Sequence, residues 1–406
     1  MTEKMTSSQM YGLLMNKHYS EAKAAKERGQ LVAWSSAIAP PEFLEVMGIY
    51  AVYPENHVAA IGAKKGAIPL MQCAEGEGYS TDTCSYARIN LGYIKMLECN
   101  FQEIPLPDLL FCTNNTCNTI TKWYEILAKE LKIPLVMLDM PFNYEYEVTK
   151  NRIDYIKAQF QQVIHQLEQI VNKPFDHDKF KEIMKVSSEA SLLWKKVADY
   201  SRMGPSPLNG FNIFNYMALS VCYRTKKESI EFFKTVIDEL DQLIKDGSSQ
   251  FPVPEKYRIM WDGIACWPYL SHNFKTLKKY GMNIVGSFYP YLWARIYEPG
   301  NLDSMAESYA SIAMNRNLAF QVETRKNILN EFRCDGAIYH MNRSCKIMDF
   351  MQLEIQRQVH VSTGIPYITF AGDQTDPRAF SEAQFELRVQ ALAETMDDLK
   401  QKAVGR

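Results

Sequence analysis

Two short segments of this chain repeat each other, although they lie far apart in the sequence. Residues 108–117 read DLLFCTNNTC and residues 336–345 read GAIYHMNRSC. Each has an apolar run, an asparagine three residues before its last cysteine, and a hydroxyl residue directly before that cysteine. An Ile-Pro pair and a second apolar run follow each segment at a similar distance, at 133–138 and 365–370. A unit of strand, loop, cysteine, helix and strand therefore occurs twice, and this duplication constrains both the fold and the position of functional residues.

The rest of the chain alternates short apolar runs with longer amphipathic stretches. The apolar runs are continuous, which is typical of parallel strands buried on both faces. We expect strands at residues 31–35, 49–53, 108–112, 134–139, 257–261, 283–287, 337–340 and 367–370. Because helical stretches separate these strands, the sequence predicts an α/β fold with two doubly wound domains and mainly parallel sheets. The predicted limits are 1–146 for the N-terminal domain, 147–250 for a region of connecting helices, and 251–406 for the C-terminal domain.

Composition excludes several classes of protein. The chain has 406 residues, enough for two domains with full cores, and a formal net charge of -2 gives no electrostatic reason to expect binding to nucleic acid or an anionic membrane. It has no apolar run of about eighteen residues, and its first residues contain no apolar signal core. We therefore expect a cytoplasmic protein without membrane association. Its nine cysteines should be core residues, catalytic thiols or metal ligands rather than disulfides.

Cys117 and Cys345 each fall where a predicted strand passes into a helix. In open parallel sheets, ligands bind beyond the carboxyl ends of the strands. The N–H groups and the dipole at a helix N-terminus favour negative charge, so we expect both thiols to have lowered pKa values and to be largely ionised. One such thiol indicates a nucleophile. Two that are related by a duplication indicate ligands of a shared metal centre.

Cys84 is a third candidate ligand. Thr81 or Asp82 is expected to be the N-cap of the next helix, which would place Cys84 in the first helical turn. The other cysteines are expected to be core or turn residues without a ligand role: Cys73, Cys99, Cys112, Cys222, Cys266 and Cys334.

Motifs spread over nearly the whole chain resemble one known family. They are YPENH at 53–57, GYSTDTCSYAR at 78–88, KWYE at 122–125, PSPLNG at 205–210, HMNRSCK at 340–346 and GDQTDPR at 372–378. They are similar to motifs of the α subunits of 2-hydroxyacyl-CoA dehydratases, a family that also includes the more distant benzoyl-CoA reductase subunits. Within the family, the segments at 39–43 and 207–219 are most similar to lactoyl-CoA dehydratase.

The resemblance implies a cofactor as well as a fold. Cys84, Cys117 and Cys345 match the family's ligands of a [4Fe–4S] cluster, whose fourth iron has no cysteine and is open to water or substrate. The duplication points to Cys117 and Cys345 independently of the resemblance. Three protein ligands with one open position are typical of a catalytic metal site rather than a structural one.

The implied reaction is the syn elimination of water from an (R)-2-hydroxyacyl-CoA to give a 2-enoyl-CoA. This requires loss of a β-hydrogen that no carbonyl acidifies. One electron added to the thioester carbonyl gives a ketyl radical, which expels the hydroxyl group and leaves an enoxy radical with a far more acidic β-proton. An iron with an open position can act as a Lewis acid while the same cluster delivers the electron.

The resemblance also implies partners. These are a homologous β subunit, an acyl-CoA substrate, and a separate ATP-dependent iron–sulfur activator that injects the electron. Because the electron is recycled after each turnover, the net reaction is redox-neutral.

Glu55 is the best polar candidate beside the cluster, because it follows a predicted strand at its carboxyl end. The resemblance gives it a role as a base or as a group that orients the substrate hydroxyl; the alternative is a solvated loop carboxylate. Ser35 and Ser36 follow the first strand and are candidates to hydrogen-bond the iron-bound oxygen. Several relatives carry serine where this chain has Ala37, so either Ser36 substitutes for it or the substrate is oriented differently.

Other polar residues near the predicted strand ends have two interpretations. Asp373, Asp376 and Arg378 either belong to the site or form a satisfied turn network, and the chain has Ala371 where relatives have aspartate. His340 is expected to be a packed histidine rather than a ligand.

Two further features are expected to be structural. The GAKKG stretch at 62–66 lacks the order of a P-loop and is expected to be a helix C-terminus with surface lysines. Four aromatic residues are expected in the core rather than in an acyl pocket: Trp123, Tyr124, Trp261 and Trp267.

Three alternative functions stay open at the level of sequence. The first is a subunit of a benzoyl-CoA-type reductase, which retains electrons in its product. The second is a noncatalytic scaffold or electron-relay subunit whose partner holds the active site. The third is a zinc–thiolate hydrolase, which iron and sulfide analysis would distinguish.

Overall fold

The structure is a computed structural model that describes residues 5–404, and it contains two parallel sheets of four strands each. The first sheet has the order β2-β1-β3-β4 and the second has the order β6-β5-β7-β8. The strands are β1 (Val32–Ser35), β2 (Tyr50–Val52), β3 (Leu109–Thr113), β4 (Leu135–Leu138), β5 (Tyr257–Asp262), β6 (Met282–Ser287), β7 (Gly336–Asn342) and β8 (Tyr367–Gly372). All eight predicted strands are confirmed, and the structure is the predicted α/β fold with two doubly wound sheets.

The duplication seen in the sequence extends to the whole topology of the sheets. In each sheet the first strand lies between the second and the third, and the fourth strand pairs with the third. The repeated segments are β3 followed by α6 (Asn118–Leu131) and β4, and β7 followed by α15 (Lys346–Asp349), α16 (Gln352–Thr363) and β8. The two cysteine-bearing loops therefore occupy equivalent positions in the two sheets.

Both faces of the first sheet are buried, which explains its continuous apolar strands. Leu109 and Phe111 of β3 lie in one core with helices α7 (Lys150–Val171), α8 (His177–Asp199) and α13 (Leu302–Ala310). Leu110 and Cys112, which alternate with them, lie in a second core on the opposite face. Helices α3 (Pro54–Ala63), α4 (Ala67–Gly76), α5 (Ser85–Met96) and α6 close that second core.

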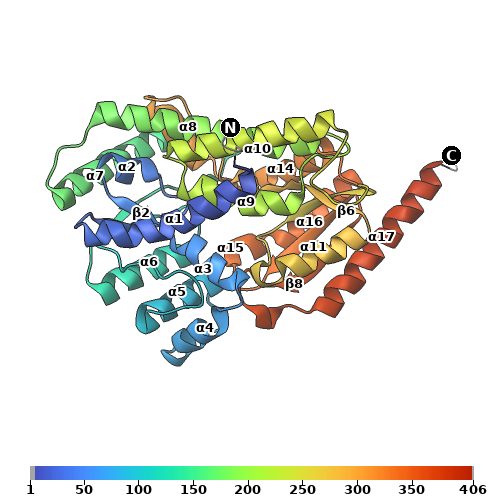
Figure 1. Ribbon diagram of the computed structural model, residues 1–406, viewed down its shortest axis with the longest axis horizontal. Coiled ribbons are helices and arrows are strands. Elements are labelled where there is room, and N and C mark those ends of the chain that lie inside the picture. The colour runs from blue at the N-terminus through green and yellow to red at the C-terminus, as the bar shows by residue number, and fades with distance from the viewer. Residues whose placement is uncertain (1–4, 405–406) are drawn as a thin grey trace.

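The remaining helices cover the second sheet or join the two halves, apart from α2 (Pro41–Val46), which packs in the core of the first sheet beside β2 (Figure 1). The others are α1 (Ser7–Glu27), α9 (Gly210–Cys222), α10 (Lys227–Lys245), α11 (Leu270–Lys279), α12 (Phe288–Tyr291), α14 (Leu318–Glu331) and α17 (Glu382–Val404). α10 packs against both α8 and α1, and runs along the upper edge of the view in Figure 1. The end of α17 extends away from the body of the molecule.

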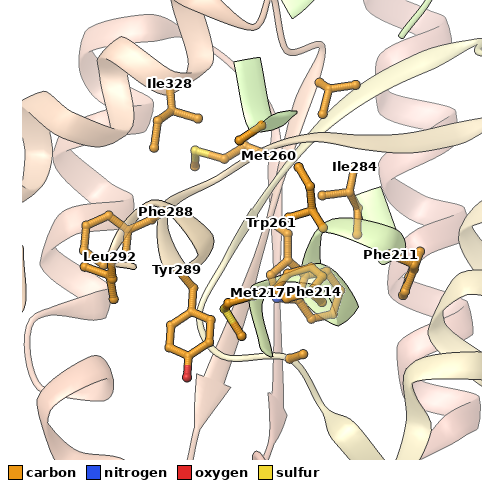
Figure 2. Close-up of a cluster of buried hydrophobic side chains, with 14 of the residues drawn as sticks. Phe211, Phe214, Met217, Met260, Trp261, Ile284, Phe288, Tyr289, Leu292 and Ile328 are labelled. Atoms are coloured by element: carbon orange, nitrogen blue, oxygen red, sulfur yellow. The ribbon is translucent and has the colours of Figure 1, made fainter. Parts of the chain in front are cut away.

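The largest core joins the second sheet to the helices of the central region. Phe214 of α9 packs edge-on against Trp261 of β5, with ring centroids 6.3 Å apart. Figure 2 shows both rings beside Met217, with Tyr289 next to them. Trp261 is therefore a core residue, as the sequence predicts.

Residues assigned to the C-terminal domain also take part in the core of the first sheet. Met305 and Tyr309 of α13 lie in that core, and α13 packs against α7. The chain therefore passes between the two halves more than once, and the predicted domain limits stay a prediction.

The predicted cap of α5 is wrong. The helix begins at Ser85, and Cys84 itself is its N-cap residue. The N–H groups of Asp82 and Thr83 instead bond to the hydroxyl and carbonyl oxygens of Ser80, at 3.1 and 3.0 Å. Because this turn satisfies those groups locally, the helix starts later than expected.

Within residues 5–404, we find no helix with the length and apolar character needed to cross a membrane. All nine cysteines are free thiols.

Candidate functional site

The three candidate cysteines occupy the same position relative to a helix, since each is the N-cap residue. Cys117 precedes α6, Cys345 precedes α15 and Cys84 precedes α5. The sulfur of Cys117 accepts a hydrogen bond from the N–H of Ile120 at 3.3 Å. A side chain at this position faces the unpaired N–H groups of the first turn, so each thiol lies at the positive end of a helix.

The same three cysteines line one cavity. It has a volume of about 780 Å³ and lies beyond the carboxyl ends of β3 and β7, as the sequence predicts for Cys117 and Cys345. Polar residues from the two repeated loops complete much of its wall: Asn114, Asn115, Thr116, Asn118, Thr119 and Ser344. The structure thus brings together cysteines that are up to 261 residues apart in the chain, Cys84 and Cys345.

The thiols do not have the lowered pKa values that we expected from their helix positions. Burial, and after it the neighbouring Cys117, raise the pKa of Cys84 to about 12. The pKa of Cys345 is also raised, first by burial and then by Cys84 and Cys117. Backbone N–H groups oppose the effect at all three sites, but the cost of removing a thiolate from water is larger. The three sulfurs are therefore stable as thiolates only when a cation is bound among them.

Loops from both halves hold Cys84 and Cys345 in place. The hydroxyl oxygen of Ser344 accepts a hydrogen bond from the N–H of Ser85 at 3.0 Å. The side-chain amide of Gln374 donates to the sulfur of Cys84 at 3.4 Å and to the oxygen of Ser344 at 3.1 Å. Sequence analysis missed Gln374, although it lies in a motif at the end of a predicted strand.

Asp373 is part of a satisfied turn, the structural interpretation left open by the sequence. Its carboxylate accepts hydrogen bonds from the N–H groups of Thr375 and Asp376, both at 3.0 Å. It also accepts from the backbone and hydroxyl groups of Ser344, next to Cys345. The loop after β8 therefore supports the loop after β7.

Asp376 and Arg378 join a network of ion pairs between the two halves. The buried guanidinium of Arg88 lies 2.5 Å from Glu75 and 3.2 Å from Asp376. Arg378 pairs with the same two carboxylates, each at 2.7 Å. This network ties α5, which begins directly after Cys84, to the second sheet.

His340 is a packed histidine, as predicted. Its ring stacks on Phe370 with centroids 4.6 Å apart, and Nδ1 lies 2.6 Å from the carbonyl oxygen of Ile264. Burial lowers its pKa to about 4, so the ring is neutral at pH 7. It lines neither the cysteine cavity nor the cavity at Glu55.

Glu55 lies in the first turn of α3, directly after β2, and is not a solvated loop carboxylate. Oε1 accepts a hydrogen bond from the N–H of Ala37 at 2.9 Å, and Oε2 accepts one from the hydroxyl of Tyr124 at 3.4 Å. Burial raises the pKa of Glu55 from 4.5 to about 7, and these hydrogen bonds partly offset the rise. A carboxyl group with this pKa can take or release a proton near neutral pH.

Ser36 is fully buried at the end of β1, and its hydroxyl oxygen accepts a hydrogen bond from the N–H of Thr113 at 3.3 Å. Ser35 donates to the carbonyl oxygen of Ser36. Neither serine lines either cavity, whereas the neighbouring Ala37 lines the one at Glu55. In this structure Ser36 connects β1 to β3, and a role toward substrate stays a prediction.

A second cavity of about 390 Å³ begins at Glu55 and Ala37. Its walls are mainly apolar and come from α1, α3 and α9 and from the segment around α12. Tyr86, two residues after Cys84, and Tyr289, two residues after β6, line it beside Glu55. The pKa of Tyr289 is raised, mainly by burial and to a smaller extent by the nearby Cys345, Glu55 and Cys84. These tyrosines therefore lie between the two cavities.

One predicted core residue, Trp267, packs against two of the cores as a partly buried side chain and also lines this second cavity. Its indole N–H donates to the hydroxyl of Tyr86 at 2.6 Å, which turns its ring toward the cavity. Tyr289 was missed by sequence analysis, although its position after a strand end was a usable signal. The GAKKG stretch forms the end of α3, as predicted, and its Lys64 lies exposed at the cavity's edge.

Comparisons with known proteins agree on one family. The family described as 2-hydroxyglutaryl-CoA dehydratase, D-component, matches residues 36–396. The (R)-2-hydroxyisocaproyl-CoA dehydratase alpha subunit of Clostridioides difficile is 49% identical over 401 residues, covering 98% of both chains. The lactoyl-CoA dehydratase alpha subunit of Anaerotignum propionicum is 42% identical over 413 residues, again covering 98% of both. A benzoyl-CoA reductase chain of Thauera aromatica is more distant, at 26% identity over 408 residues, with 95% of this chain and 93% of that one covered.

Proposed function

The chain belongs to the family of the 2-hydroxyglutaryl-CoA dehydratase D-component, and from this premise we propose that it is the α subunit of a 2-hydroxyacyl-CoA dehydratase, a hydro-lyase. Its reaction is the syn elimination of water from an (R)-2-hydroxyacyl-CoA to a 2-enoyl-CoA. The observation that carries the proposal is the cavity lined by Cys84, Cys117 and Cys345, which adjoins the second cavity at Glu55.

The three cysteines would hold a [4Fe–4S] cluster with one open iron. In residues 5–404, no three His, Cys, Asp or Glu side chains are placed to hold a single metal ion. A cluster makes a different demand, since each of its irons takes its own thiolate and the ligands can lie further apart. Three thiols around a roomy cavity, each stable as a thiolate only beside a cation, fit that demand.

When bound, such a cluster supplies one-electron transfer and an iron with an open position for an oxygen ligand. One electron on the thioester carbonyl yields a ketyl radical, which expels the 2-hydroxyl group. The enoxy radical that remains loses its β-proton, and return of the electron gives the 2-enoyl-CoA. The sum is loss of one water molecule without net oxidation or reduction.

Within this reaction, Glu55 would hold and move the proton. With a pKa of about 7 it is partly ionised at neutral pH, so Oε1 or Oε2 can accept the β-proton. The N–H of Ala37 and the hydroxyl of Tyr124 fix its orientation. Ser36 would orient the oxygen of the substrate by donating its O–H, which its oxygen can do while it accepts from the N–H of Thr113.

The proposal includes partners and a location. A homologous β subunit would complete the enzyme, and an ATP-dependent iron–sulfur activator would deliver the first electron. The substrate is an acyl-CoA, and the complex would work in an anaerobic cytoplasm, in amino acid fermentation. The word alpha in the relatives' names supports the expectation of a second subunit.

The test is anaerobic purification of the chain together with its β subunit. We expect iron and sulfide in the amounts of a [4Fe–4S] cluster, and dehydration of a 2-hydroxyacyl-CoA when activator, ATP and reductant are added. Cys345→Ala should lose iron and activity together. Cys73→Ala is the matched control, because Cys73 lies in α4 and lines neither cavity.

Each failure has a distinct meaning. Full cluster content and activity in Cys345→Ala would refute the ligand set. A product that retains two electrons per turnover would instead indicate a benzoyl-CoA-type reductase. A cluster whose EPR spectrum substrate never perturbs would indicate an electron-relay subunit.

A further inference from the structure

The sulfur of Cys84 receives a hydrogen bond from a side chain in the other half of the chain. The side-chain nitrogen of Gln374, in the loop after β8, lies 3.4 Å from this sulfur. The sulfur of Cys117 instead accepts from the backbone N–H of Ile120, in the helix that Cys117 caps. Among residues 5–404, Gln374 is the only side-chain donor to any of the three candidate ligands. Cys84 therefore has a contact that the other two cysteines lack.

A chain of hydrogen bonds fixes which end of the Gln374 amide faces Cys84. The carboxylate of Asp373 accepts the hydroxyl hydrogen of Ser344. Because a hydroxyl group has a single hydrogen, the oxygen of Ser344 can only accept from Gln374, whose side-chain nitrogen lies 3.1 Å away. The amide nitrogen carries two hydrogens, so one points at Ser344 and the other is available to Cys84. A reversed amide would place two acceptor oxygens against each other.

The side chain of Gln374 is not needed to hold its loop against Cys84. The backbone carbonyl of Gln374 accepts a hydrogen bond from the backbone N–H of Trp267 at 3.0 Å. The hydroxyl oxygens of Thr375 and Ser85 lie 2.6 Å apart, in a further hydrogen bond. These contacts tie the loop after β8 to the start of α5 without the amide group.

The oxygen of the same amide has no partner. Gln374 is fully buried, and its Oε1 has no hydrogen-bond partner among the described residues. Buried polar groups are normally paired, so a glutamine here carries a cost that an apolar residue of the same size would avoid. Packing alone therefore does not account for this residue, whereas a need for its N–H groups does.

The donor belongs to the second half of the molecule alone. The register of the strand pairs makes Pro141, in the loop after β4, the counterpart of Gln374 in the first half. A proline side chain has no hydrogen to donate. The duplicated fold therefore does not provide such a donor by itself, and Gln374 is a specific feature of one loop.

A donor at a ligand sulfur changes how readily an iron–sulfur cluster accepts an electron. The raised pKa of Cys84 shows that negative charge on this sulfur is unfavourable in the fold, mainly because of burial. An added electron increases the negative charge on the ligand sulfurs, and hydrogen bonds to these sulfurs are among the features that set a cluster's reduction potential. The net contribution of one hydrogen bond corresponds to a factor of about three to ten in an equilibrium.

We propose that Gln374 raises the electron affinity of the cluster that the three cysteines would hold, by donating an N–H to the sulfur of Cys84. Asp373 and Ser344 are positioning residues that keep the amide in the orientation this requires. Reduction adds one electron to the cluster and takes one from the external donor, with no bond formed or broken. The inference rests on the proposed function, because it concerns the cofactor named there.

The experiment is an EPR-monitored redox titration of the anaerobically purified complex with the β subunit. The signal to follow is the one that Cys345→Ala lacks, which assigns it to this chain. Gln374→Leu keeps a side chain of similar size and removes both N–H groups. At the midpoint potential of the native cluster, its ratio of reduced to oxidised form should be about three- to tenfold lower than in the native protein. A tenfold fall corresponds to a potential about 59 mV more negative.

Gln358→Leu is the matched control, because Gln358 lies in α16 and lines neither cavity. Its potential should equal that of the native protein. An unchanged or more positive potential in fully loaded Gln374→Leu would overturn the proposal.

A measurement on the native complex applies if Gln374→Leu loads no cluster. Glutamine labelled with nitrogen-15 in its side-chain amide is incorporated, and the reduced complex is studied by pulsed EPR. We expect a weak coupling between the labelled nitrogen and the cluster, since the amide nitrogen lies 3.4 Å from a ligand sulfur. Absence of this coupling would also overturn the proposal.

Iron and sulfide counts separate this inference from the proposed function. A native complex without iron and sulfide would contradict the cofactor of the proposed function. A native complex that holds the cluster and dehydrates a 2-hydroxyacyl-CoA, but whose potential does not respond to Gln374→Leu, would leave the function intact and overturn this inference alone.

Discussion

Replacing Tyr124 by phenylalanine should move the pH dependence of the enzyme without changing its maximal rate. Tyr124 is buried in α6, and its hydroxyl donates a hydrogen bond to Oε2 of Glu55 at 3.4 Å. This bond favours the ionised carboxylate and therefore opposes the effect of burial, which raises the pKa of Glu55 to about 7. Tyr124→Phe removes only the oxygen atom, so it removes that opposition and leaves the packing of the ring.

The size of the effect follows from the geometry. A hydrogen bond to a charged group contributes about 1.5 to 3 kcal/mol, and the 3.4 Å distance places this one below that range, at about 1 kcal/mol. Since 1.36 kcal/mol corresponds to one pKa unit, the pKa of Glu55 should rise by about 0.7. At pH 7 the ionised fraction then falls about threefold, while above pH 9 almost all of the carboxyl group is ionised in both proteins.

The assay is kcat/KM for dehydration against pH, with the activator in excess. We expect the acid limb of the native enzyme to have its midpoint near pH 7 and that of Tyr124→Phe to lie about 0.7 units higher. Tyr93→Phe is the control, because Tyr93 is also buried but its hydroxyl bonds to the backbone of Ile104. An unshifted acid limb in Tyr124→Phe would refute the assignment of Glu55 as the base, as would an equal loss of rate at every pH.

Three further predictions concern stability and cluster retention. Burial keeps Glu55 neutral up to about pH 7 in the folded state, whereas in the unfolded chain it ionises at about pH 4.5. Glu55 therefore destabilises the folded state at high pH. Urea titration should show that Glu55→Gln raises the free energy of unfolding by up to about 3 kcal/mol at pH 8 and leaves it unchanged at pH 4. Arg88→Ala should lower the free energy of unfolding by about 3 kcal/mol, because it breaks a buried ion pair. Arg357→Ala, at an exposed ion pair, should change it by less than about 1 kcal/mol. Similar values for the two variants would contradict a stabilising role for the ion-pair network around Arg88. Gln374→Ala removes the donor to Cys84 and should speed iron release to a chelator by about two- to tenfold, an expectation that unchanged release kinetics would exclude.

The strands and two of the site cysteines were predictable because their signals are local. Continuous apolar runs mark strands that are buried on both faces, and all eight runs became strands. Cys117 and Cys345 follow strands of a parallel sheet, where the topology itself creates a ligand site. Neither conclusion required knowledge of side-chain packing.

The remaining features depend on contacts between distant segments. The pKa values of the cysteines were predicted with the wrong sign, because helix position can be read from the sequence whereas the depth of burial cannot. Trp267 packs against the cores as predicted, and its place in a cavity wall, with its N–H bonded to Tyr86, depends on a segment far away in the chain. Likewise, the position of Cys84 is set by contacts with Ser344 and Gln374 from the other half of the chain.

The duplication also explains why the proposed cluster would have three cysteine ligands rather than four. The repeated units supply one cysteine each, Cys117 and Cys345. Cys84 lies between β2 and β3, in a segment of the first half. The corresponding segment between β6 and β7 contains only Cys334, which is buried against the core just before β7 and lines neither cavity. In its place the second half presents Tyr289, which lines the cavity together with Glu55. The second half therefore supplies one cysteine to this region where the first half supplies two, and Tyr289 instead lines the cavity at Glu55, on the side where the substrate would bind.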